Sequence, residues 1–196
     1  MTRRVLAGAA ALLGVLALFA GSPYAERPDV DVARLASAIA HEDDHITAVE
    51  LAEWIRARKP GLRVIDLRTE GEWNAYHLPR AERMAIESLA SASFEPSETV
   101  VLVSGGGAHA AQAWVLLRVR GHRQVYFLRG GVREWIDDVM NPTVAADASP
   151  AARAAFQRVS DVSRYFGGVP RVVEKLPVKS KDDVVAAAAA VRRRGC

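Results

Sequence analysis

Residues Ser104–His109 have a composition that favours anion binding. Three glycines follow an apolar run and precede a stretch with helical periodicity, so this segment connects a strand to a helix. Backbone N–H groups and the dipole of the following helix favour negative charge at such a junction. In a parallel α/β sheet, ligands bind where strand ends meet helix starts. The candidate anion-binding residues are therefore Ser104, Gly105, Gly106, Gly107, Ala108 and His109.

Ser104 places a hydroxyl at the head of this loop. A serine nucleophile needs a base held by a third group, and an elbow of the Gly-x-Ser-x-Gly kind. Val103-Ser104-Gly105 is not that elbow, and His109 lies five residues further on. We therefore interpret Ser104 as a small residue that preserves the shape of the loop. His109 either contacts an anion or is a solvated histidine at a helix start.

A second pattern, His41-Glu42-Asp43-Asp44-His45, matches the zinc protease signature His-Glu-x-x-His. That signature needs both histidines on one helix face, a third ligand, and the glutamate as base. Two adjacent aspartates weaken a helix here, and His45 leads into a strand. We interpret the match as chance in a polar linker, and we expect no metal and no cofactor.

Cys196, the last residue, is the only cysteine. An intramolecular disulfide is therefore excluded. Arg192–Arg194 precede it and favour the thiolate form, so the thiol could carry sulfur into the Ser104 loop. The alternative is an incidental terminal cysteine that forms a disulfide dimer.

The N-terminus is typical of an export signal, because two arginines precede the uncharged apolar run Val5–Ala20. This run has 16 residues, whereas a membrane span usually needs about 20. Cleavage after Ala25 would put Pro23 at position −3, which fits poorly, so an uncleaved anchor through residues 5–20 stays open. We expect residues 1–25 to export the protein to the periplasm, with a possible tether to the inner membrane.

Composition and charge bound the rest of the chain. Of 196 residues, 50% are apolar and 25% charged, which fits one domain with additions. The formal charge of +3 is too small to indicate a nucleic-acid partner. Residues 1–25 contribute two arginines and no acidic residue, so that the +3 becomes +1 without them.

Apolar runs that alternate with helical patterns predict the central domain. The expected strands are 63–68, 81–86, 99–104 and 124–128. Thr47 and Glu50 form a capping box at the start of a helix. The expected buried helix faces are Ala48, Leu51, Ala52 and Ile55, and then Ala110, Ala113, Trp114 and Leu117. Strands alternating with helices predict a parallel sheet with helices on both faces.

Additions flank this domain on both sides. A short amphipathic helix in residues 26–43 carries Val32, Leu35 and Ile39 at helical spacing. After Pro142, Ser149-Pro150 starts a helix with a stripe of Phe156, Val159, Ser163 and Phe166. A final helix is expected from Ser180, with acidic residues in its first turn and arginines in its last. We divide the chain into four parts. Residues 1–25 are a signal or anchor and residues 26–43 a lead-in helix or linker. Residues 44–140 form the α/β domain, and residues 141–196 form a helical extension that ends in Gly-Cys.

The segment from His45 to Asp138 resembles a rhodanese domain, the fold of the sulfurtransferases. The resemblance rests on the order and spacing of several short motifs. These are Asp66-Leu67-Arg68, Glu72, His77-Leu78-Pro79, the loop beginning at Ser104, and Gly130-Gly131 with Trp135 four residues on. The resemblance implies an α/β rhodanese-like sheet.

In an active rhodanese the loop begins with a cysteine that carries a persulfide, and a basic residue ends the loop. This chain has Ser104 and His109 at those positions. A hydroxyl is a far poorer nucleophile than a thiolate and cannot carry persulfide sulfur. The persulfide route from this position is therefore excluded. The six-residue loop matches sulfur chemistry rather than the longer loop of related phosphatases, which also need the cysteine.

The resemblance also assigns roles to other polar and aromatic residues. Asp66 and His77 are expected to fix turns and helix starts, and Arg68 is a candidate to face the anion of the loop. The four tryptophans are expected to fill the core or its rim rather than bind a ligand: Trp54, Trp73, Trp114 and Trp135.

We therefore expect a catalytically degenerate, periplasmic rhodanese-like module, a pseudoenzyme connected with sulfur metabolism. It would bind a small sulfur-containing anion or a protein partner through Ser104–His109. The alternative is a sulfur carrier that uses the Cys196 thiol. We do not expect conventional thiosulfate sulfurtransferase activity, because the loop lacks its cysteine.

Overall fold

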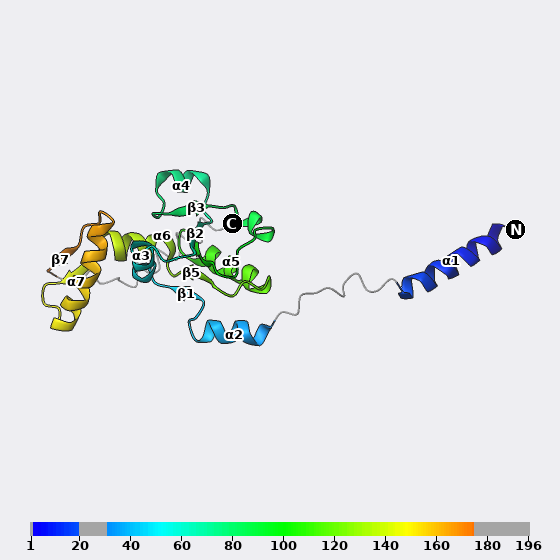
Figure 1. Ribbon diagram of the computed structural model, residues 1–196, viewed down its shortest axis with the longest axis horizontal. Coiled ribbons are helices and arrows are strands. Elements are labelled where there is room, and N and C mark those ends of the chain that lie inside the picture. Colours follow the sequence, from blue (N-terminus) through cyan, green and yellow to red (C-terminus); the bar gives the residue numbers. More distant parts are fainter. Residues whose placement is uncertain (1, 20–30, 175–196) are drawn as a thin grey trace.

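The computed structural model describes residues 2–19 and 31–174 (Figure 1). The predicted export segment forms helix α1, Thr2–Phe19, whose side chains Val5, Leu6 and Leu12 are exposed. Within the described ranges, no helix is both long and apolar enough to cross a membrane. The cleavage position at Ala25, the predicted final helix and Cys196 lie outside the described residues.

A five-stranded parallel sheet, in the order β1-β5-β4-β2-β3, forms the centre of the domain. Its strands are β1 (His45–Ile46), β2 (Leu62–Asp66), β3 (Ala81–Arg83), β4 (Thr99–Val103) and β5 (Val125–Leu128). All four predicted strands are present, and the strand predicted at 81–86 ends at Arg83. Every residue of β4 is buried, as expected of a central strand covered on both faces.

Helix α3 (Ala48–Arg56) covers one face of this sheet, together with α6 (Gly131–Glu134), and α7 (Pro150–Tyr165) packs beside α3 (Figure 1). The predicted capping box of Thr47 and Glu50 is present, and all four apolar residues of the predicted α3 face are buried. They pack with Val64, Val101 and Val103, which alternate with the strand residues that point to the other face.

The other face is covered by α5 (Ala108–Val119), the 3-10 helix η1 (Ile86–Ala90) and α2 (Val32–Ala40). The predicted buried face of α5 is confirmed. The predicted short helix is present as α2, and two of its apolar residues, Val32 and Ile39, are 68% and 54% exposed. Only Leu35 and Ala38 contact the core, since α2 packs on the domain along a narrower line than its apolar spacing indicated.

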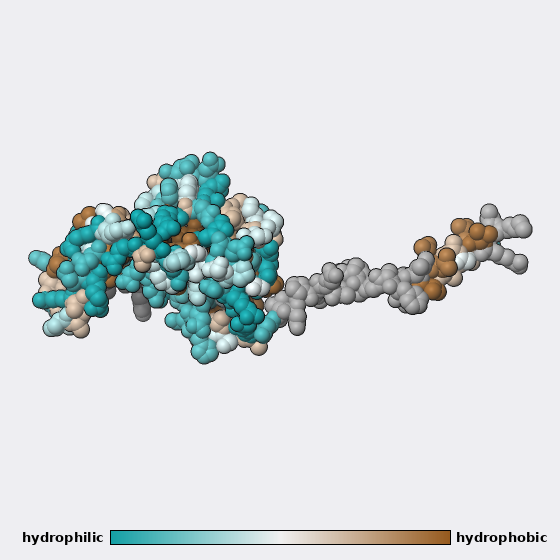
Figure 2. Space-filling view, viewed as in Figure 1, coloured by the Kyte–Doolittle hydropathy of each residue, from teal (hydrophilic) through white to brown (hydrophobic). Residues whose placement is uncertain are grey.

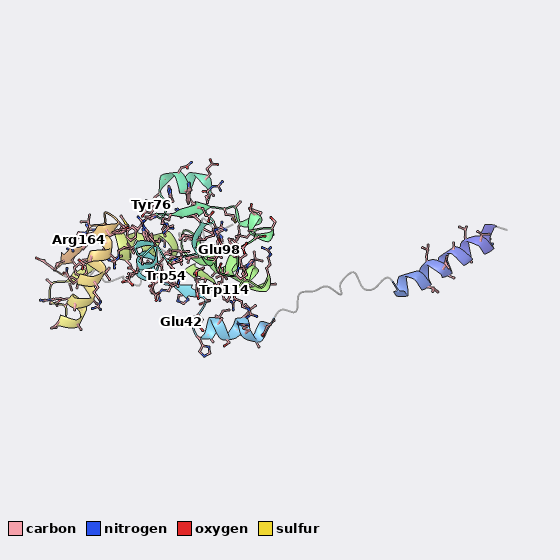
Figure 3. The ribbon with its side chains drawn as sticks, viewed as in Figure 1. Glu42, Trp54, Tyr76, Glu98, Trp114 and Arg164 are labelled. Atoms are coloured by element: carbon pink, nitrogen blue, oxygen red, sulfur yellow. The ribbon has the colours of Figure 1, made fainter. Side chains whose placement is uncertain are left out.

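The tryptophans divide as expected between the core and its rim. Trp114 and Trp135 are almost fully buried, and the Trp114 indole N–H donates to the Val125 carbonyl. Trp54 is half-buried beside Tyr126, with the Lys59 ammonium over its ring. Figure 3 labels Trp54 and Trp114, which belong to the clusters on opposite faces of the sheet.

Residues 141–174 add a small unit beside α3. Strands β6 (Thr143–Ala145) and β7 (Arg171–Val173) pair in parallel, and α7 (Pro150–Tyr165) connects them. Ser149 caps α7 through its hydroxyl, as predicted. Of the predicted stripe, Ser163 is buried and Phe156, Val159 and Phe166 are half-buried, and Ser160 and Val162 complete the buried face. The two short strands were not predicted, since each has only three residues.

The zinc-protease pattern does not lie on one helix. Helix α2 ends at Ala40, a turn follows, and His45 belongs to β1, as the sequence indicated. The His45 Nδ1 atom lies 2.8 Å from an Asp44 carboxylate oxygen. Among the described residues, no group of three or more His, Cys, Asp or Glu side chains could hold a metal ion.

Candidate functional site

The Ser104–His109 loop connects the carboxyl end of β4 to the amino end of α5, as predicted. Ser104 and Gly107 are buried, whereas Gly105, Gly106, Ala108 and His109 are exposed. Gly107 precedes the first turn of α5 with a φ of 92°. A side chain there would be strained, and a Cβ atom would lie 3.2 Å from the Gly130 nitrogen. Glycine at this position lets the loop turn tightly into the helix.

The Ser104 hydroxyl is turned into the loop. Its Oγ accepts hydrogen bonds from the N–H groups of Gly107, at 3.1 Å, and of Ala110, at 3.3 Å. The residue is only 3% exposed. These contacts favour the interpretation that Ser104 preserves the shape of the loop. No histidine or carboxylate contacts this hydroxyl among the described residues, so the arrangement lacks the base of a serine nucleophile.

The loop also presents backbone donors. In the described part of the chain, the N–H groups of Gly105, Gly106, Ala108 and His109 donate to no protein acceptor. Two of them belong to the first turn of α5, where N–H groups lack intrahelical partners and the dipole is positive. All four residues are exposed. Water or an anion can therefore accept from these donors.

A second turn supports the loop from the neighbouring strand. Gly130 and Gly131 follow β5 with φ values of 63° and 61°. The N–H groups of Val132 and Arg133 donate to the carbonyls of Ser104 and Gly105, at 2.9 and 3.3 Å. A Cβ atom on Gly131 would overlap the Ser104 carbonyl oxygen and lie 2.9 Å from the Gly107 nitrogen. The backbone approach that holds the loop therefore requires glycine at position 131.

Asp66 and Arg68 form a buried ion pair below this region. The Arg68 guanidinium donates to both Asp66 carboxylate oxygens at 2.6 to 3.1 Å, and to the Tyr76 carbonyl at 2.7 Å. The Arg68 side chain is 9% exposed and the Asp66 side chain 0%. These hydrogen bonds hold the Arg68 guanidinium on Asp66 and Tyr76, and among the described residues it donates none to the loop.

Tyr76 extends this network toward the Gly130-Gly131 turn. The Trp135 indole N–H donates to the Tyr76 hydroxyl at 2.9 Å (Figure 3 labels Tyr76). Burial raises the pKa of the Tyr76 hydroxyl, and the hydrogen bond from Trp135 and the charge of Arg68 oppose that rise. Trp135 also meets the Phe166 ring edge-on at 5.3 Å. The ends of β2, the second turn and α7 are therefore connected through Tyr76 and Trp135.

Helix α4 (Glu70–Ala75) contributes an acidic side chain near the loop. A capping box with Thr69 lowers the pKa of Glu72, and the charges of Arg68 and His109 lower it further, although burial opposes this. His109 is therefore close enough to Glu72 for their charges to interact. His77 lies outside the loop, stacked on Trp73 at 4.0 Å with its Nδ1 atom 3.1 Å from the Trp73 carbonyl. That contact agrees with the structural role expected of His77.

A groove of about 1130 Å³ opens beside the loop. Its lining includes Gly106 and Gly130 of the two turns, residues of β6 and α7, and Arg171. Residues 135–140, which form the π-helix η2 (Trp135–Met140), supply an acidic wall. No sequence pattern predicts this groove, because it depends on how residues 141–174 pack against the domain.

The family model of the rhodanese-like domain matches residues 47–138. A rhodanese-like domain of an Anabaena protein is 31% identical over 46% of this chain and 71% of its own length, with a TM-score of 0.43. A rhodanese-like domain protein from Staphylococcus aureus is 25% identical over 48% of this chain and 93% of its own, with a TM-score of 0.44. No curated protein matches the chain.

The contact between the two turns predicts that alanine substitutions at Gly131 and at Gly106 have very different effects on the free energy of unfolding. Gly131→Ala should lower the free energy of unfolding by more than about 2 kcal/mol, because it combines a left-handed φ with overlap of the Ser104 carbonyl. Gly106→Ala, whose Cβ would meet nothing within 4 Å, should lose less than about 0.5 kcal/mol. Urea denaturation measures both changes. Equal losses in the two variants would contradict the close approach.

The ion pairs predict a similar contrast between two arginines. Arg68→Met leaves the Asp66 carboxylate buried without its partner and should cost about 3–5 kcal/mol of unfolding free energy. Arg63→Met removes a more exposed pair with Glu82 and should cost less than about 1 kcal/mol. Thermal and urea unfolding test this order. A cost for Arg68→Met as small as that of Arg63→Met would show that the buried pair does not hold the loop region.

Proposed function

The chain belongs to the family of rhodanese-like domains, and on that premise we propose that it is a catalytically degenerate module which binds a small sulfur-containing anion through the Ser104–His109 loop. A protein partner could present such an anion to the loop. The observation that carries the proposal is a loop with four exposed N–H donors and a buried serine at its head.

The absence of a thiol at position 104 supports the degenerate character of the loop. Sulfur transfer through a persulfide needs a thiolate that attacks and then holds the transferred sulfur. The Ser104 hydroxyl instead accepts from two backbone N–H groups and has no base beside it in the described structure. The donors that would stabilise a charged sulfur therefore satisfy a neutral oxygen.

The charge of the anion would be balanced mainly by backbone dipoles. Arg68 is engaged by Asp66 and Tyr76, so it adds no hydrogen bond of its own to the loop. His109 is the nearest candidate for a side-chain contact, because it is exposed in the first turn of α5. Glu72 opposes binding through its negative charge, which Arg68 partly offsets. We expect the site to select small anions with several acceptor atoms.

The proposed location is the periplasmic side of the cell envelope. The support for it is the sequence of residues 1–25, with two arginines, an apolar run and a small-residue exit. We propose that this segment exports the chain or tethers it to the inner membrane. An anion-binding module there would meet sulfur compounds outside the cytoplasm.

Titration of the full-length chain with thiosulfate tests this function. Backbone amide shifts should move first at Gly105, Gly106, Ala108 and His109, because their N–H groups would donate to the anion. His109→Ala should weaken binding about three- to tenfold, the effect of one hydrogen bond of roughly 0.5–1.5 kcal/mol. The matched control is His122→Ala, at the opposite end of α5.

Two results would contradict the proposal. One is a native amide spectrum in which these four signals do not respond to thiosulfate. The other is an equal loss of affinity in His109→Ala and His122→Ala, which would place the anion elsewhere.

The second candidate function is a sulfur carrier that works through Cys196. Its support is that the chain has one thiol, which directly follows Arg192–Arg194 and Gly195. Intact mass after exposure of the full-length chain to a polysulfide should then show added sulfur, lost in Cys196→Ser. An unchanged mass, with Cys196 shown to be reduced and accessible, would remove this candidate and leave anion binding unaffected.

A further inference from the structure

The groove beside the loop is lined by two chemically different sets of residues. The face of α7 and the turn before it supplies small and apolar side chains: Ala148, Ala152, Ala155, Phe156 and Val159. Their spacing of three and four residues places them in one stripe along the helix. The charged residues that line the groove are three acidic ones, with Asp137 exposed, and two basic ones: Glu134, Asp137, Asp138, Arg133 and Arg171. The groove is therefore shaped for an apolar helix that carries positive charge at one end.

The stripe on α7 stays open to solvent among the described residues. Ala152 and Ala155 are exposed, and Phe156 and Val159 are half-buried. Phe156 and Val159 belong to the stripe that the sequence predicted for this helix, and the fully buried residues of α7 are Ser160, Val162 and Ser163. Figure 2 shows apolar surface, in brown, over the part of the molecule that holds α7 and β7. Val169 and Val172 in this unit are 58% and 65% exposed. Exposed apolar side chains gathered in one stripe indicate a surface that binds another segment or protein.

We propose that residues 175–196, the C-terminal segment of this chain, dock in this groove. The segment contains an uninterrupted apolar run, Val184–Val191, made only of valine and alanine. Small side chains let a helix approach the alanine-rich wall of α7 closely, and the valines meet Phe156 and Val159. Acidic residues begin this predicted helix and three arginines end it, as helix capping favours.

Charge and connectivity agree with this occupant. Strand β7 leads directly into the segment, and its first residue, Arg171, lines the groove. Residues 182–194 as a helix would extend about 20 Å, and the seven residues before them can span up to about 25 Å. The chain can therefore enter beside β7 and lead toward Gly130, with Arg192–Arg194 facing Glu134 and Asp137.

This docking would bring the end of the chain to the loop. Gly106 and Gly130 line the groove next to the acidic wall, so Gly195 and Cys196 would lie beside the exposed N–H donors. The inference does not rest on anion binding, because it follows from the groove and the composition of the segment. It also gives the extension a purpose that the rhodanese-like domain alone does not supply.

A spin label on Cys196 tests the docking in the full-length chain, because no other thiol competes for the label. Paramagnetic broadening should be strong at the amides of Gly106 and Gly130 and absent at Gly121, at the opposite edge of the sheet. Asp137→Lys should reduce that broadening by roughly half or more, since it places a positive charge against Arg192–Arg194. Asp161→Lys, an exposed change on α7 outside the groove, should leave it unchanged.

Three outcomes would overturn the proposal. In the first, Gly106 and Gly130 broaden no more than Gly121. In the second, Asp137→Lys and Asp161→Lys behave alike. The third uses isotope-labelled Cys196→Ser chains mixed with spin-labelled, unenriched chains: broadening of Gly106 there would show that the segment occupies the groove of a second copy.

Discussion

The contact between two glycine turns is the constraint on which the site depends. Parallel pairing of β4 with β5 brings the Ser104 loop beside the Gly130-Gly131 turn at one edge of the sheet. The carbonyls of Ser104 and Gly105 then accept from the first N–H groups of α6, and Gly131 leaves no room for a Cβ atom. These loop carbonyls are therefore hydrogen-bonded within the protein, whereas four loop N–H groups have no protein acceptor among the described residues. The contact between the two turns therefore leaves the loop with free hydrogen-bond donors rather than free acceptors.

The serine at the head of the loop is compatible with the same geometry. Its hydroxyl satisfies two N–H groups, so replacing a thiol by a hydroxyl leaves no buried donor without a partner. A hydrogen-bonded network runs from Asp66 and Arg68 through Tyr76 to Trp135. None of these hydrogen bonds involves residue 104. The fold of a rhodanese-like loop is thus compatible with serine at its head.

Local signals in the sequence predicted most of the domain, and tertiary packing decided the rest. The capping box at Thr47 and the buried β4 strand depend on neighbouring residues, so their patterns were sufficient. The exposure of Val32 and of the apolar stripe on α7 depends on which elements pack against these helices. The spacing of apolar residues in the sequence does not contain that information. The ion pair of Arg68 with Asp66 also depends on packing, because a fully buried carboxylate needs a partner of opposite charge. The groove beside the loop could not be predicted either, because it forms only when residues 141–174 pack against the domain.

The central claim is that the loop keeps the shape of a sulfur-binding cup and lacks only the thiol. The most direct measurement is the intact mass of the Ser104→Cys, Cys196→Ser double variant after incubation with thiosulfate, compared with Cys196→Ser alone. A thiolate at position 104 should displace sulfite from thiosulfate and retain one sulfur atom as a persulfide, while the single variant retains none. A folded double variant that gains no sulfur would contradict the account, because the loop would then not hold the charged sulfur that its geometry is argued to accept.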